Sequence, residues 1–119
     1  MKRRYAIVGS RRYPALDRVS EYVASLPRES TVVTGSASGV DAAATRAARE
    51  RGLPVIRVAA SFEEAQDARV AAERNQRLID QADVLVAFWD GTSAGTRGTV
   101  ERALDSGKDV QVFIDKIRT

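Results

Sequence analysis

The chain has 119 residues, of which 44% are hydrophobic and 29% are charged, and its formal net charge is +3. This length fits one domain that buries a core without cross-links, and the absence of cysteine excludes disulfides and thiolate metal sites and is consistent with a reducing compartment. The absence of histidine excludes histidine acid–base catalysis, Ser-His triads and ordinary zinc sites, and the small positive charge is typical of a mixed-charge surface.

The beginning of the chain resembles neither a targeting signal nor a membrane anchor. Residues 1–4 are basic, but the apolar run that follows them, residues 5–8, is too short for the core of a signal peptide. Elsewhere too, no apolar run approaches the length of a membrane span. We therefore expect a soluble, cytoplasmic protein with no membrane partner.

Strand and helix patterns alternate in the first half of the chain. Residues 5–8 form a short apolar run that predicts a strand, and apolar spacing over 16–26 predicts a helix. The β-branched run 31–34 predicts a second strand. A stripe of small apolar residues over 40–48 predicts a helix that lies close to the sheet.

The same alternation continues in the second half. We expect a strand over 54–59, a long helix over 62–82 and an entirely apolar strand over 84–89. A further helix is expected over 96–104, and a last strand over 110–114. Uninterrupted apolar strands indicate a sheet that is covered on both faces.

This order of elements predicts an α/β fold. Strands separated by helices imply right-handed crossovers and a parallel sheet. We expect one Rossmann-like, three-layer domain over residues 1–119, with a five-stranded parallel sheet in the order 3-2-1-4-5. The order reverses between the first and fourth strands.

Most of the eight glycines follow the strands predicted over 5–8, 31–34 and 84–89. Their positions lie on the carboxyl edge of the sheet, around the switch point where doubly wound folds bind ligands. Glycine lets a backbone approach a ligand closely, and the helix N-termini that follow offer free amides to an anion. Tight turns alone are the alternative explanation. The six glycines are Gly9, Gly35, Gly39, Gly91, Gly95 and Gly98.

Hydroxyl side chains lie among these glycines and suit the oxygens of phosphate and ribose. The pattern is neither GxGxxG nor a P-loop, which disfavours NAD and ordinary nucleoside triphosphates. We therefore predict a nucleotide or a related phosphorylated ligand. The hydroxyls are Ser10, Ser36, Ser38, Thr92, Ser93, Thr96 and Thr99.

Four motifs in these loops resemble those of the YspA-like proteins. Residues 8–11 resemble their GSR opening, and residues 34–44 resemble a GGARGxDxxA loop that is also found in the DNA-processing protein A family. Residues 74–75 resemble their RN pair, and residues 83–96 resemble their aDxxvaF and GxSxGT segments. All four occur in order across nearly the whole chain, which is therefore similar to the Rossmann-like superfamily known as SLOG.

The resemblance implies a nucleotide-derived ligand, because the superfamily also includes the Lonely Guy cytokinin-activating hydrolases and the nucleoside deoxyribosyltransferases. Some of these relatives cleave an N-glycosidic bond with a glutamate three residues after the threonine of their GT pair. The matching position here is Thr99, and the nearby Glu101 points away from the core stripe. The resemblance implies ligand binding more clearly than it implies turnover.

Two other carboxylates could supply the charge that N-glycosidic cleavage requires. Asp41 follows the glycine loop in the first turn of a predicted helix, where it could contact a ligand or complement the helix dipole. Asp90 ends the strand predicted over 84–89 and could hold a ribose hydroxyl or shape a turn. Asp41 and Asp90 are the candidate catalytic residues.

Other side chains could bind the phosphate or the base of a ligand. Asn75 lies on an apolar stripe, so its amide must bond to a loop backbone or to the ligand. Arg74 and Arg11 could bind phosphate. Phe88 or Trp89 could stack on a base, or could belong to the core.

Three functions remain open: a nucleotide-binding module or sensor, an N-glycosidic hydrolase or transferase, and a DNA-associated protein resembling the DNA-processing family. The first is favoured over nucleic-acid binding. We expect no cofactor and no metal, and a homo-oligomer because relatives commonly form one. The residues expected to contact the ligand are Gly9, Ser10, Arg11, Gly35, Ser36, Ala37, Ser38, Gly39, Asp41, Arg74, Asn75, Asp90, Gly91, Ser93, Gly95, Thr96 and Thr99.

Overall fold

Strands and helices alternate along the chain, as the sequence predicts. The computed structural model describes residues 2–35, 39–58 and 68–116. The strands are β1 (Arg4–Gly9), β2 (Thr31–Thr34), β3 (Val55–Arg57), β4 (Val84–Trp89) and β5 (Asp109–Ile114). The helices are α1 (Leu16–Ala24), α2 (Val40–Glu50), α4 (Ala68–Asp80) and α5 (Ala94–Asp105).

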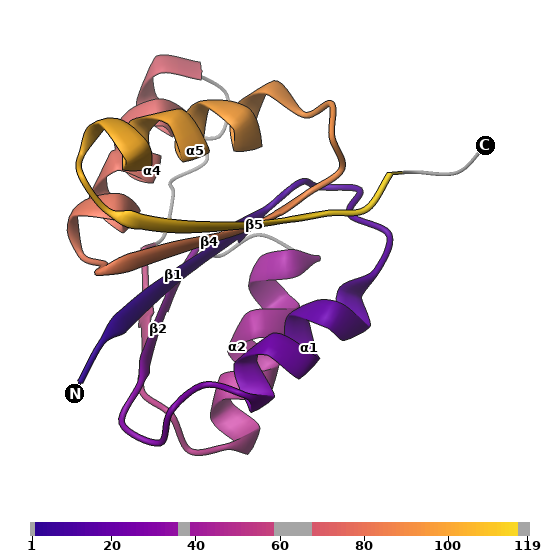
Figure 1. Cartoon of the computed structure of the whole chain (residues 1–119), viewed down its shortest axis with the longest axis vertical. Helices are drawn as coiled ribbons and strands as arrows, with labels where there is room; N and C mark the ends of the chain where they lie inside the picture. Colours follow the sequence, from indigo (N-terminus) through magenta and orange to yellow (C-terminus); the bar gives the residue numbers. More distant parts are fainter. Residues whose placement is uncertain (1, 36–38, 59–67, 117–119) are drawn as a thin grey trace.

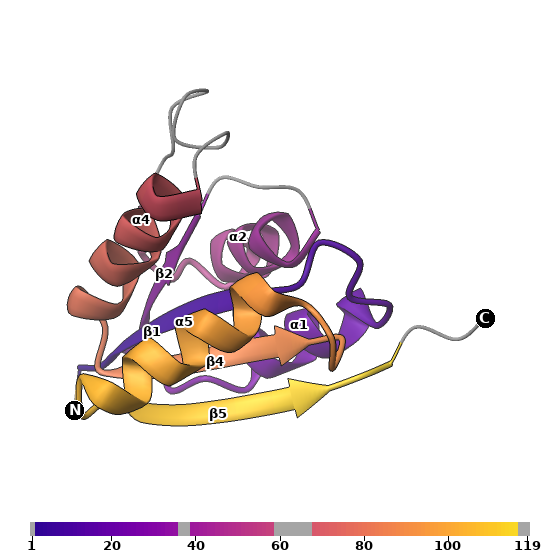
Figure 2. The same ribbon diagram turned by 90° about the horizontal axis from the view of Figure 1, so that it is seen from above.

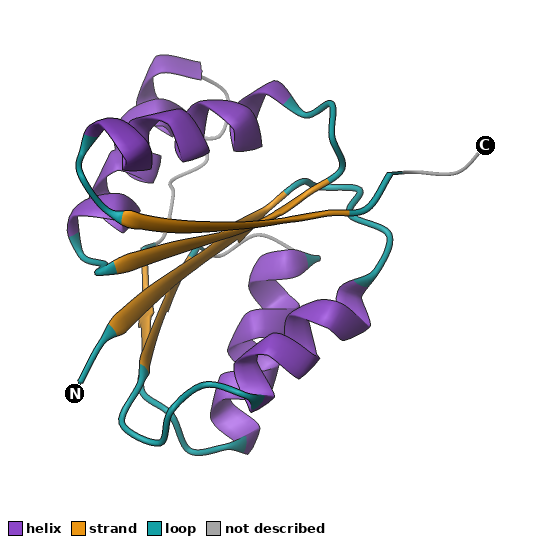
Figure 3. Cartoon of the chain, in the orientation of Figure 1, coloured by secondary structure: helices purple, strands orange, loops and turns teal. Residues whose placement is uncertain are grey.

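The strands form one parallel sheet in the order β3-β2-β1-β4-β5, which confirms the predicted topology. Helices α1 and α2 cover one face of this sheet, and α4 and α5 cover the other (Figure 1). Coloured by secondary structure, the same view shows helices on both sides of the strands (Figure 3). The result is the three-layer, Rossmann-like arrangement expected from the sequence.

Alternate residues of the central strands supply two separate cores. On β1, Ile7 packs into the core beneath α1 and α2, whereas Ala6 and Val8 face the core beneath α4 and α5. Both sides of β1 and β4 are buried, so these strands need apolar residues at every position. This explains why their sequences show no alternation.

The edges of the sheet differ from the sequence prediction in two respects. Of the strand predicted over 54–59, β3 begins one residue late, because Pro54 has no N–H for the ladder and only its carbonyl accepts a bond, from Val32 N at 3.0 Å. Residue 59 lies outside the described residues. Strand β5 is not covered on both faces, since Val112 and Ile114 are 40% and 50% exposed. Its position at the edge of the sheet leaves it fewer neighbours (Figure 2).

Strand register brings the carboxyl ends of the strands to one edge. Gly9 pairs with Phe88, and Thr34 pairs with Arg57. The loops that follow β1, β2 and β4 therefore leave the sheet side by side, and α2 and α5 begin at this edge (Figure 2). In the described ranges of the chain, no helix is long and apolar enough to cross a membrane.

Candidate functional site

A cluster of hydroxyls joins β1 to the beginning of α5 at the carboxyl edge. Ser10 Oγ lies 3.2 Å from Thr96 Oγ1, and Thr96 Oγ1 lies 3.2 Å from Ser93 Oγ. Ser93 is the N-cap of α5, and its hydroxyl accepts a bond from Thr96 N at 3.5 Å. Ser10 and Thr96 are only 2% and 6% exposed. The cluster therefore forms a polar floor at the switch point between β1 and β4.

Asp90 organises the loop between β4 and α5. Its Oδ1 accepts hydrogen bonds from Thr92 N at 2.9 Å and Ser93 N at 2.8 Å, and the Thr92 hydroxyl also donates to it. These bonds, that of the Thr92 amide first among them, hold the pKa of Asp90 below its ordinary value. Of the two roles considered for Asp90, the structure shows the turn-shaping one.

Trp89, the last residue of β4, holds the same loop through its side chain. Its indole N–H donates to Ser93 O at 2.9 Å. Ser93 therefore contributes its amide to Asp90, its carbonyl to Trp89 and its hydroxyl to the cap of α5. The beginning of α5 is held in place by three independent bonds.

Asn75 connects α4 to α5. Its Nδ2 donates to Thr99 Oγ1 at 3.0 Å, and its Oδ1 accepts from Arg74 Nη2 at 2.9 Å. Thr99 in turn donates to Gly95 O at 3.0 Å and is 3% exposed. The sequence left a loop backbone or the ligand open as the partner of this amide; in the structure its nitrogen bonds to a side chain, that of Thr99.

Asp41 and Arg74 meet over Gly35, the residue after β2. A Cβ on Gly35 would lie 2.7 Å from Asp41 Oδ2 and 2.8 Å from Arg74 Nη1. The other carboxylate oxygen of Asp41 accepts from Thr34 Oγ1 at 3.2 Å. Two helices from opposite faces of the sheet thus bring opposite charges to the end of β2.

The structure gives different reasons for a glycine at each of the predicted positions. A Cβ on Gly9 would lie 2.8 Å from Val40 Cβ and Cγ1, so Gly9 lets α2 approach β1. Gly39 and Gly91 have φ of +76° and +87°, which favour glycine. A Cβ on Gly95 or Gly98 would meet no atom within 4 Å in the described part of the chain. Only the last two glycines lack a packing or backbone explanation.

Several cations surround this edge. Arg11 and Arg12 follow β1 and are exposed, and Arg57, exposed at the end of β3, is level with Thr34. A Cβ on Gly39 would lie 3.6 Å from Arg11 O, so the loop of Arg11 touches the beginning of α2. Lys116 lies against Gly91. The site thus has a polar floor and a positively charged rim.

The structure brings together most of the residues that the sequence singled out. Ser36, Ala37 and Ser38 lie outside the described residues. Glu101 is exposed and pairs with Arg97 at 3.2 Å, as expected of a surface residue. Thr34 and Lys116 were missed, although Thr34 ends β2 and Lys116 lies two residues after β5, so position at the end of a strand was the signal that could have identified them.

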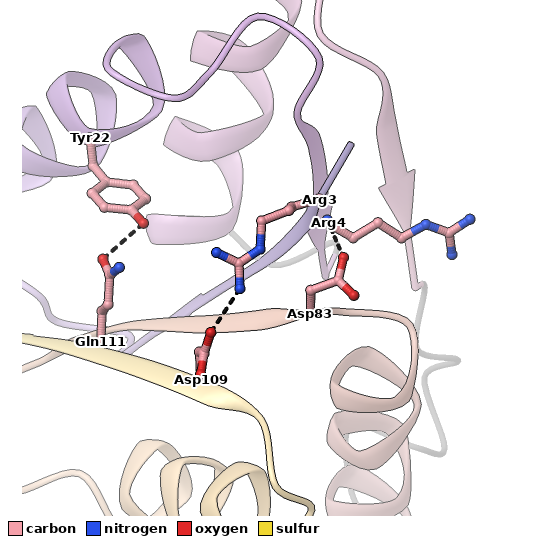
Figure 4. A network of polar contacts seen from close by, with 6 residues as sticks. All are labelled: Arg3, Arg4, Tyr22, Asp83, Asp109 and Gln111. Atoms are coloured by element: carbon pink, nitrogen blue, oxygen red, sulfur yellow. Dashed lines mark hydrogen bonds and ion pairs between the residues drawn. The ribbon is translucent and has the colours of Figure 1, made fainter. Parts of the chain in front are cut away.

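The opposite edge of the sheet has a different character. There a hollow of about 440 Å³ is lined by both basic and acidic residues. Figure 4 shows the ion pair between Arg3, which lines the hollow, and Asp109, 2.7 Å apart, and the bond from Arg4 N to Asp83 at 2.7 Å. The hollow is lined by four basic side chains, Lys2, Arg3, Arg4 and Lys108, and by two acidic ones, Asp80 and Asp83. Within the described ranges, no group of three or more acidic side chains comes together to hold a metal ion.

Comparisons with known proteins agree with this fold. The family model for DNA recombination-mediator protein A matches residues 1–102. The chain is similar to the X-ray structure of DNA processing protein A from Streptococcus pneumoniae, with a TM-score of 0.82 and 22% identity over 97% of this chain and 51% of that one. It thus spans about half the length of that protein. No curated protein matches the chain.

Proposed function

This chain belongs to the DNA recombination-mediator protein A family, and we propose that it binds the phosphorylated part of a nucleotide-derived ligand at the carboxyl edge of its sheet, without turning the ligand over. The observation that carries the proposal is the arrangement of Arg74, Gly35 and the beginning of α5 around one polar floor.

The groups that face this edge suit a phosphate. Arginine forms paired bonds with phosphate oxygens, and backbone amides at a helix N-terminus add a positive dipole. The Arg74 guanidinium is anchored on Asn75 and lies against Gly35, which has no side chain of its own, with the carboxylate of Asp41 beside it. The open space at Gly95 supports close approach of a ligand to the first turn of α5.

The state of two side chains supports binding without turnover. Thr99, which stands where the resembled hydrolases carry glutamate, is buried and bonded to both Asn75 and Gly95. Asp90 uses Oδ1 to hold its own loop. Asp41 is the remaining carboxylate close to Gly35, so the test must detect any cleavage of an N-glycosidic bond with the help of Asp41.

A second function, association with DNA, is supported by the family of the chain and by the cations of the same edge, Arg11, Arg12, Arg57 and Lys116. Binding to a phosphate backbone weakens steeply with salt. Fluorescence anisotropy with a labelled single strand at two salt concentrations tests it. A salt-independent signal, or none at low salt, would reject DNA association.

The main experiment measures the melting temperature with nucleoside mono- and diphosphates, ADP-ribose, cyclic nucleotides and phosphoribosyl compounds. A ligand that binds the native state raises the melting temperature by mass action. Arg74→Gln should abolish the rise in melting temperature. Arg102→Gln also removes one positive charge, but in the last turn of α5, far from the proposed site at its first turn, and should preserve the rise.

Chromatography of each stabilising compound separates binding from catalysis. Recovery of the intact compound supports the proposal, whereas release of free base would make the protein an N-glycosidic enzyme. The proposal would be overturned if no compound raised the melting temperature, or if Arg74→Gln and Arg102→Gln reduced the rise equally.

A further inference from the structure

The aromatic rings closest to the carboxyl edge are already used by the protein itself. Phe88 is 0% exposed, stacks on Phe113 with centroids 5.1 Å apart and meets the Tyr13 ring edge-on. Tyr13 is buried, and its hydroxyl donates to Asp115 at 2.8 Å. These rings have their faces covered, so a nucleobase has no access to them.

Trp89 is half-buried, but its position is fixed by the loop. Its indole N–H is bonded to Ser93 O, and the bond holds the ring beneath the beginning of α5. A tryptophan that supports a loop in this way acts on every ligand of that loop alike. It does not distinguish a ligand with a base from one without.

The side chains that usually read base edges are also engaged internally. Asn75 bonds to Arg74 through its oxygen and to Thr99 through its nitrogen. Asp90 bonds to two amides of its own loop. Among the described residues, this edge also carries guanidinium groups, the ammonium group of Lys116, hydroxyls and backbone amides, which recognise phosphate and sugar oxygens.

We infer that the site recognises the sugar–phosphate part of its ligand and is indifferent to the base, so that its ligand class includes a pentose phosphate lacking any base. The inference rests on the proposed function. It adds that adenine, guanine, cytosine and uracil contribute little to affinity.

Calorimetric titration of the full chain with ribose 5-phosphate and the four nucleoside monophosphates tests this inference. The five dissociation constants should agree within about threefold, because stacking on an aromatic side chain would strengthen binding by a factor of about 5 to 150. A tenfold or greater preference for one base, or binding of nucleotides without ribose 5-phosphate, overturns the inference but leaves the proposed function standing. No binding of any of the five overturns the inference, and the proposed function is overturned with it only if the other compounds of the melting-temperature panel fail to stabilise the protein too.

Variants of Trp89 give a second readout. Trp89→Leu removes the ring, and Trp89→Phe keeps a ring but removes the N–H donor. Each variant should weaken the binding of AMP and of ribose 5-phosphate by the same factor, leaving the ratio of the AMP to the ribose 5-phosphate dissociation constant unchanged. A rise by more than about fivefold in the ratio of the AMP to the ribose 5-phosphate dissociation constant in Trp89→Leu, with Trp89→Phe unaffected, would show base stacking and overturn the inference.

Discussion

Val40, the first residue of α2, packs directly against the Cα of Gly9 at the end of β1. A methyl group on Gly9 would lie 2.8 Å from two carbon atoms of Val40, which is 2% exposed and has a stiff, β-branched side chain. This contact fixes how closely the beginning of α2 approaches the sheet.

Gly9→Ala should therefore destabilise the fold. Overpacking of this kind costs about 1–3 kcal/mol, because neither β1 nor Val40 can move aside without disturbing the core. Urea denaturation measures the change in the free energy of unfolding. Val40→Ala in the same chain should recover part of the loss, since it vacates the space that the new methyl needs. Independent, additive effects of the two substitutions would contradict the contact.

Gly95→Ala should weaken ligand binding without destabilising the protein. An added methyl at this helical position meets no described atom and raises helix propensity by up to about 1 kcal/mol. Gly98→Ala is the matched control, because Gly98 lies in the same helix, has equal space, and is one turn further from the N-terminus. The dissociation constant of a compound that stabilises the protein should rise only for Gly95→Ala. Equal affinities in the two variants would place the ligand elsewhere.

The fold could be predicted because each strand is a short apolar run bounded by turn residues. The pattern at 84–89 has no polar interruption and becomes β4 with the same bounds. The prediction was weaker at the edges of the sheet, where burial depends on neighbours that lie far away in the sequence. The exposure of Val112 follows from its edge position and not from its residue type, whereas β3 begins after Pro54 because proline has no N–H for the ladder.

The site was harder to predict, because a glycine after a strand has several physical causes. Gly9 makes room for Val40, Gly39 supplies a positive φ, and Gly95 leaves open space. The sequence gives the same signal for all three. The bond from Asn75 to Thr99 joins residues 24 positions apart on two helices, so helical spacing showed that the amide needed a partner but not which one.

Asp90→Ala should destabilise the protein by about 1–3 kcal/mol, because the amides of Thr92 and Ser93 lose a charged acceptor. Asp90→Asn keeps an acceptor oxygen and should cost less. The pKa of Asp90 lies below its ordinary value of 3.8 in the folded state, so its contribution is complete above that pH and is lost as the pH falls through the folded value.

Acid denaturation curves of the three proteins measure this contribution. The wild-type protein should lose more stability than Asp90→Asn when the pH falls below 3.8, because only the wild-type side chain takes up a proton there. Parallel curves for these two proteins would show that the charge of Asp90 does not stabilise the loop.

Two tyrosines should make the protein sensitive to alkali. Burial, and then the hydrogen bond to Asp115, raises the pKa of Tyr13 to about 12, and burial raises that of Tyr22 to about 12. In the unfolded chain both ionise near 10, while the folded protein still holds their protons. The free energy of unfolding should therefore fall as the pH rises from about 10 to about 12.

Tyr13→Phe and Tyr22→Phe should each flatten that decline. Tyr13→Phe should also cost about 1 kcal/mol at neutral pH, since the bond to Asp115 is lost. Tyr22→Phe loses only the bond between the Tyr22 hydroxyl and the exposed side chain of Gln111 and should cost less. Urea denaturation across the alkaline range, with tyrosinate absorbance of the folded protein, measures both effects. Ionisation of both rings near 10 in the folded protein would show that neither hydroxyl is protected from solvent.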